Sequence, residues 1–117
     1  MNVKDLLSNA NLAFLNQENE TALSLANQAI KLDRKNANAY KTAANACMSL
    51  ERYEDAIKNY KQAVTLDPAN GNRYYDLGFA CASSNKLADA IKAFAKAEEL
   101  GCTPENLTQL YHILGIT

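Results

Sequence analysis

The sequence repeats itself with a period of 34 residues, over 3–36, 37–70 and 71–104. Eleven positions are identical between the second and third segments and nine between the first and second, which rules out chance matches in an alanine-rich chain. A period of roughly 20–50 residues is typical of stacked supersecondary units, each of which buries its apolar face only against a neighbour. The period therefore predicts an array of similar units.

Composition and spacing predict that each unit is a pair of helices. Alanine supplies 20 of the 117 residues, against 4 glycines and 2 prolines, and alanine has the best helix propensity. In the middle unit, apolar residues recur at helical spacing over 38–49 and again over 54–66, before Asp67-Pro68 ends the pattern. An all-α fold follows.

Small and large apolar residues alternate where these helices are expected to meet. Gly78 and its alanine counterparts leave room for close approach, and Tyr60 and Phe94 fill the remaining space. Cys47 and Cys81 recur at one unit position, which predicts small buried core residues, while Cys102 falls in a turn where we expect it can reach solvent. No C-x-x-C pair indicates a disulfide framework or a zinc site.

Composition also excludes several function classes. The net charge of −1 gives little attraction to nucleic acid, and no apolar run approaches the roughly 20 residues of a membrane span. The first residues lack the pattern of a signal peptide, so we expect a cytoplasmic protein. His112 is the single histidine, and no phosphate loop, metal-ligand motif or nucleophile motif is present, which predicts no enzyme activity, no metal and no cofactor.

The unit pattern resembles the tetratricopeptide repeat (TPR) family. The residues that carry the resemblance in the third unit are Tyr74, Leu77, Gly78, Cys81, Ala90, Phe94 and Ala97. The first unit matches less well and has Arg34 where the family has proline. The resemblance implies one domain over 1–117, folded as a right-handed α-solenoid of three TPR helix-turn-helix repeats.

The last segment predicts a further helix over 104–114. Thr103 and Pro104 are typical of a helix start, and leucines then follow at helical spacing up to Gly115. Such a helix can act as a C-terminal cap that covers the last repeat, because a terminal repeat has no neighbour to bury its apolar face. The alternative is that this helix opens a fourth repeat.

The family resemblance also implies that the first helix of each unit lines a concave groove that binds a partner. The partner-binding residues carried over onto this sequence are Asn11, Phe14, Lys41, Asn45, Met48, Asn72, Tyr75, Asp76 and Phe79. Apolar anchors with amides between them suit an extended peptide or a helix of another protein. The alternative for Phe14 and Phe79 is that they pack at helix junctions.

Some TPR adaptors of chaperones hold a C-terminal carboxylate with a set of lysines, asparagines and an arginine. Lys41 and Asn45 match the first pair of that set, but Asp76 stands where a second asparagine is expected. An anionic side chain there would repel a carboxylate, so we predict that this chain does not bind such tails.

We therefore predict a non-catalytic protein-protein interaction module, with a monomer favoured. We expect Phe79→Ala and Asn45→Ala to weaken partner binding and to leave the melting temperature nearly unchanged. The alternatives are an assembly element that self-associates through its solenoid ends, and a regulatory domain of a larger protein.

Overall fold

The computed structural model describes residues 1–102, which form six α-helices and no strand. The predicted helix over 104–114 lies outside the described residues. The helices are α1 (Val3–Leu15), α2 (Asn19–Leu32), α3 (Ala37–Ser49), α4 (Tyr53–Leu66), α5 (Gly71–Ser83) and α6 (Leu87–Glu99). The two helices predicted for the middle unit are confirmed to within one residue at their starts.

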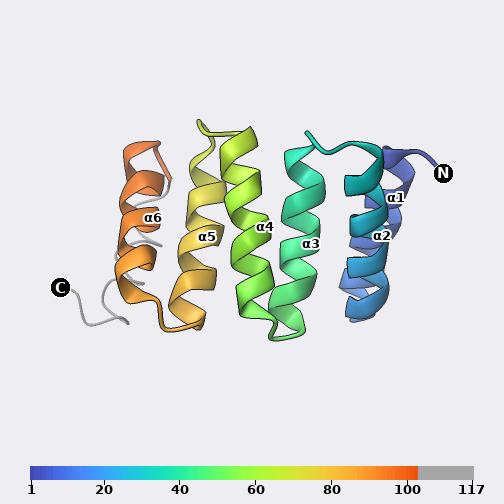
Figure 1. Ribbon diagram of the computed structural model, residues 1–117, viewed down its shortest axis with the longest axis horizontal. Helices are drawn as coiled ribbons and strands as arrows, with labels where there is room; N and C mark the ends of the chain where they lie inside the picture. Colours follow the sequence, from blue (N-terminus) through green and yellow to red (C-terminus); the bar gives the residue numbers. More distant parts are fainter. Residues whose placement is uncertain (103–117) are drawn as a thin grey trace.

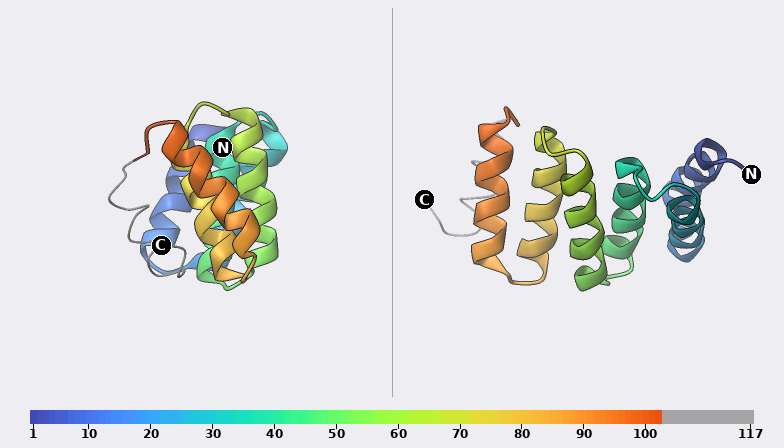
Figure 2. Two further views of the ribbon diagram at one scale, coloured as in Figure 1. Left: turned by 90° about the vertical axis from the view of Figure 1, so that its left-hand side faces the viewer. Right: turned by 45° about the horizontal axis from the view of Figure 1, so that its top comes forward.

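Consecutive helices form three hairpins that stand in a row (Figure 1). Each helix packs against the next one along the chain, and α1 also contacts α3. The row is elongated, 47 × 26 × 21 Å, with the first and third hairpins at opposite ends (Figure 2). This arrangement confirms the predicted all-α repeat fold.

The first helix of every hairpin begins with the same asparagine cap. Asn2, Asn36 and Asn70 are 34 residues apart and directly precede α1, α3 and α5. In each case the side-chain oxygen accepts a hydrogen bond from a first-turn backbone N–H, at distances between 2.8 and 3.3 Å. Such a cap stabilises a helix by about 1 kcal/mol, so one residue type sets the start of each repeat.

The turn within each hairpin is built in the same way three times. Gln17, Glu51 and Asn85 have φ angles of 64°, 59° and 63°, in the left-handed region. The backbone N–H of the following residue then donates to the carbonyl five residues earlier, at 2.8 Å in all three turns. The left-handed residue and this hydrogen bond together satisfy carbonyls at the ends of α1, α3 and α5. They also turn the chain so that the second helix runs antiparallel to the first.

Polar contacts join each hairpin to the next. Glu20 bonds to Arg52 at 2.6 Å, and the same pair recurs one period later between Glu54 and Lys86 at 2.8 Å. Both pairs are exposed to solvent, so each contributes little to stability. Arg73 is different, because it is 8% exposed and its guanidinium donates to Asn38 (2.7 Å) and Asp67 (3.3 Å). This buried arginine links α5 to α3 and to the end of α4.

The core consists of the small and aromatic residues that the sequence indicated. Cys47 and Cys81 are 1% exposed and Phe94 is fully buried, as predicted. Cys102 is also buried, so the expectation that it reaches solvent was wrong. It lies beside Gly71 at the start of α5, because Gly101, with a φ angle of 88°, turns the chain toward that helix.

Gly78 allows α5 and α6 to come into close contact. A methyl group at this position would lie 2.5 and 2.6 Å from two carbons of the Phe94 ring, where a real contact needs about 3.5 Å. Since Phe94 is fully enclosed, its ring has no open space to move into.

We therefore expect Gly78→Ala to lower the free energy of unfolding by about 1–3 kcal/mol through overpacking. Chemical denaturation of the variant, of Phe94→Leu and of the double variant measures this. The double variant should lose less stability than the sum of the two single variants, because the smaller side chain makes room for the methyl group. Additive losses would show that Gly78 is not constrained by Phe94.

Candidate functional site

A pocket between α1, α3, α4 and α5, the central pocket, brings together most of the predicted groove residues. Its cavity volume is about 300 Å³. The residues that line it are Phe14, Asn45, Met48, Ser49, Tyr60, Tyr75, Asp76 and Phe79. Six of these are among the nine residues predicted from the sequence, and they come from the first helix of all three hairpins.

A second pocket adjoins the central pocket at Asn45, and we call it the amide pocket. It has a cavity volume of about 330 Å³ and is lined by Leu7, Asn11, Asn38, Lys41, Thr42 and Asn45. It contains the predicted residues Asn11 and Lys41. The two pockets together hold eight of the nine predicted residues.

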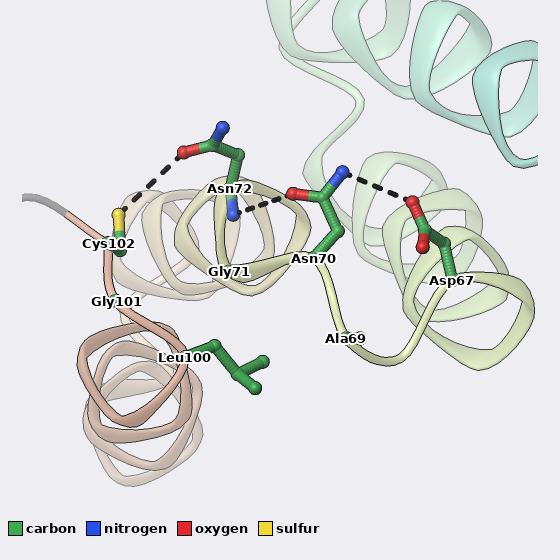
Figure 3. A pocket seen from close by; sticks show the side chains of 8 residues that line it. All are labelled: Asp67, Ala69, Asn70, Gly71, Asn72, Leu100, Gly101 and Cys102. Atoms are coloured by element: carbon green, nitrogen blue, oxygen red, sulfur yellow. Dashed lines mark hydrogen bonds between the residues drawn. The ribbon is translucent and has the colours of Figure 1, made fainter.

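The structure places Asn72 apart from the other eight. It lines a third pocket, of about 410 Å³, at the start of α5, together with residues that follow α4 and α6 (Figure 3). There the Asn70 side chain accepts a hydrogen bond from the backbone N–H of Asn72 and donates one to Asp67. The side-chain oxygen of Asn72 faces the Cys102 sulfur at 3.9 Å. These contacts lie at the start of α5, beside the residues that follow α4 and α6, and do not extend the central pocket.

Aromatic rings give the central pocket an apolar wall. Phe79 is 45% exposed, an unusual state for a large ring, whereas Phe14 and Tyr75 are half-buried. The Tyr75 ring is held against the buried Phe94 ring, with centroids 5.9 Å apart and planes tilted by 54°. Stacking of this kind fixes the orientation of Tyr75 at the pocket wall. Phe14 also packs against the buried Ala13, Ala22 and Ala46, so part of its surface does belong to a helix junction.

Asn45 is bonded within the protein, which the sequence did not indicate. Its side-chain oxygen accepts a hydrogen bond from the hydroxyl of Tyr60, a residue that is 4% exposed. Burial, with smaller contributions from Asp76 and Cys47, raises the pKa of Tyr60, so the hydroxyl stays protonated and acts as the donor. The Asn45 amide nitrogen has no partner within residues 1–102 and remains available to donate.

Asp76 is the one charged residue of the central pocket. Its carboxylate lies 4.0 Å from Lys41 Nζ, and its side chain is 27% exposed. Burial raises its pKa, although Lys41 and Arg73 act in the opposite direction. Desolvation therefore outweighs the attraction of both cations, and the ionised carboxylate lacks sufficient compensation in the free protein.

Tyr60 is the pocket residue that sequence reasoning assigned to the core alone. It is indeed buried, yet its hydroxyl reaches the pocket at Asn45. The sequence contained a signal for this role of Tyr60. The same position of the third repeat is Phe94, so the hydroxyl of Tyr60 is an addition at a core position, and such a hydroxyl needs a hydrogen-bond partner.

The described residues contain no group of three or more histidine, cysteine, aspartate or glutamate side chains arranged to hold a metal ion. No helix within residues 1–102 is long and apolar enough to cross a membrane. The chemistry that the two pockets offer is apolar contact, amide hydrogen bonding and one carboxylate beside one ammonium group.

Stacked helical hairpins define the class of helical repeat proteins. In this chain the stack carries an open surface of apolar and amide groups. Residues 44–83 match the family described as TPR repeat. No curated protein matches the sequence. The sequence match over residues 44–83 and the shared fold confirm the resemblance to the tetratricopeptide repeat family.

Solved TPR structures share this fold at low sequence identity. The first TPR of Spaghetti (RPAP3), bound to the HSP90 peptide SRMEEVD, superposes with a TM-score of 0.91 at 20% identity, over 97% of this chain and 90% of that one. The Arabidopsis OM64 TPR domain gives 0.89 at 23% identity, over 96% and 93%. MamA gives 0.81 at 23% identity, over 85% of this chain, which spans 58% of the length of MamA.

The bond between Asn45 and Tyr60 changes the expected result of one substitution. We expect Asn45→Ala to lower the free energy of unfolding by about 1–3 kcal/mol, because it leaves a buried hydroxyl without an acceptor. The earlier expectation of an unchanged melting temperature therefore does not hold for this residue. In a Tyr60→Phe background the same substitution should cost clearly less, which denaturant unfolding of the four proteins measures. An equal cost in both backgrounds would contradict the proposed role of the bond.

Asp76→Asn should stabilise the free protein at pH 7. Since the pKa of Asp76 is raised, the folded state binds its proton more tightly than the unfolded chain, and ionisation at neutral pH destabilises the fold. We expect the melting temperature to rise by about 2 °C at pH 7. The difference from wild type should shrink as the pH falls and the native carboxylate takes up its proton, which it does at a higher pH than an ordinary aspartate. A lower melting temperature at pH 7 would show that attraction to Lys41, Arg73 or both outweighs burial.

Proposed function

We propose that this chain is a protein-protein interaction module that binds an extended peptide or a helix of a partner across the central and amide pockets. The observation that carries the proposal is the exposed Phe79 ring, which borders a concave pocket whose other rings are Phe14 and Tyr75. Clusters of partly exposed aromatic rings inside a pocket are the usual anchors of protein interfaces. The amides of Asn11 and Asn45 lie beside them and can bond to a peptide backbone.

The scaffold supports this role because it is already in place before a partner arrives. Most pocket residues lie on α1, α3 and α5, whose ends are fixed by asparagine caps and hairpin turns. A preformed site loses little conformational entropy when it binds, so more of the contact energy appears as affinity.

The comparisons support the same kind of ligand. The first TPR of Spaghetti was solved with a peptide, and its fold matches this chain over nearly its whole length. The TPR fold is in general a non-catalytic scaffold for protein interactions, and the two pockets offer apolar contacts and amide hydrogen bonds.

Self-association through the ends of the row is supported less well. Adjacent hairpins are joined by ion pairs from Glu20 and Glu54 to the basic residues Arg52 and Lys86. At the two ends the equivalent positions are Glu18, which is acidic, and Ala88, which is uncharged. A second copy stacked end to end would therefore lack the ion pair that joins hairpins inside the chain.

A library of random dodecapeptides displayed on phage, selected on the full chain, tests the proposal. We expect the selected peptides to bind Phe79→Ala at least tenfold more weakly than wild type, because the substitution removes the exposed anchor. Leu32→Ala is the matched control: Leu32 is 61% exposed at the end of α2, lies outside both pockets, and should leave affinity unchanged.

Fluorescence anisotropy with synthetic copies of the selected peptides measures both affinities, and thermal melts verify that both variants fold. Equal affinity of wild type and Phe79→Ala, or failure of any peptide to be selected, would overturn the proposed groove.

A further inference from the structure

The central pocket combines one carboxylate with a wall of rings. Asp76 is its only charged side chain, and Phe14, Tyr75, Phe79 and Met48 line the same pocket. The equivalent residues of the first and second repeats are Ser8 and Thr42, so the negative charge is particular to the third repeat. Since the first two repeats have a neutral residue at this position, a charge is not needed here to form a stable helix.

The Asp76 carboxylate is incompletely paired in the free protein. Within residues 1–102 it accepts no hydrogen bond, and its nearest cation, Lys41 Nζ, stands at 4.0 Å on the side of the amide pocket. Arg73, one turn away on α5, is not available, because its guanidinium already donates to Asn38 and Asp67. The two carboxylate oxygens therefore keep most of their capacity to accept hydrogen bonds from a ligand.

The rings around the carboxylate select the kind of group that fits beside it. Arginine and lysine carry a charged head on an apolar stem, and a guanidinium or ammonium group is attracted both to a carboxylate and to the face of an aromatic ring. The exposed Phe79 and the half-buried Tyr75 supply such rings next to Asp76. An acidic side chain or a C-terminal carboxylate would instead meet a like charge in a partly desolvated pocket.

We propose that the central pocket binds an arginine or lysine side chain of a partner peptide, with apolar residues on either side of it packed against Phe14, Met48 and Phe79. The proposal rests on the proposed function and adds the chemistry of the ligand. It places the cationic head at Asp76 and the apolar stem along the rings. The HSP90 peptide in the related structure contains two adjacent glutamates, so this chain is expected to prefer a different sequence.

The sequences of peptides selected from the phage library test this directly. On wild type we expect enrichment of one arginine or lysine flanked by leucine, isoleucine, methionine or phenylalanine. On Asp76→Asn the basic residue should disappear from the selected set while the apolar residues remain. Asp89→Asn is the matched control, because Asp89 is an exposed aspartate on α6 outside the pockets, and it should select the wild-type sequences.

A double-substitution cycle then locates the contact. For a selected peptide, replacing its basic residue with norleucine or introducing Asp76→Asn should each weaken binding at least tenfold. The second change should have little further effect once the first is made, because both remove the same pair. Additive losses would place the basic residue elsewhere and overturn the proposal.

The remaining outcomes separate the two proposals. Peptides that depend on Phe79 but are acidic or purely apolar would overturn the basic-residue proposal and leave the groove in place. Tighter binding of selected peptides to Asp76→Asn than to wild type would do the same. Absence of any Phe79-dependent peptide would overturn both.

Discussion

Close approach of the two helices in each hairpin depends on side chains no larger than a methyl group at the points of contact. Ala44, Ala56 and Ala63 in the second hairpin are fully buried, and in the third hairpin Gly78 has no room even for a methyl group. Large residues such as Phe94 fill the space that remains. Because α2 and α4 also pack against the first helix of the following hairpin, this spacing influences where the side chains of α1, α3 and α5 meet.

The repeating features of the fold could be predicted because they depend on local sequence. A helix pair per period, its boundaries and its buried small residues all follow from spacing, propensity and the proline after α4. The period itself places equivalent residues at equivalent points. The resemblance to the TPR family further implied that residues as distant as Phe14 and Phe79 share one surface, and the structure brings them to one pocket.

Several contacts between helices could not be predicted, because they join residues far apart in sequence and occur in one repeat only. The bond from Tyr60 to Asn45 crosses between two helices, and the buried Arg73 replaces an alanine of the preceding repeat. Asn72 and Cys102 meet because the chain folds back after α6. In each of these cases the position within the repeat predicts where the backbone of a residue lies. Only the packed structure shows which partner its side chain contacts.

In the proposed binding mode, stability and recognition oppose one another at Asp76. Residues that cap the first helix of each hairpin repeat along the chain, as the three asparagines do, whereas the position of Asp76 is serine, threonine and then aspartate. A partly desolvated charge lowers the stability of the free protein, and such local exceptions are concentrated at functional sites.

The ion pairs between hairpins also define an order among them. Only the second hairpin carries both members of the pair, the acid Glu54 and the base Arg52, whereas the first contributes only the acid Glu20 and the third only the base Lys86. A duplicated copy of the middle hairpin inserted after residue 70 would find a partner on each side. The outer hairpins, if exchanged, would find none, so the chain can be lengthened from its middle but its ends are not interchangeable.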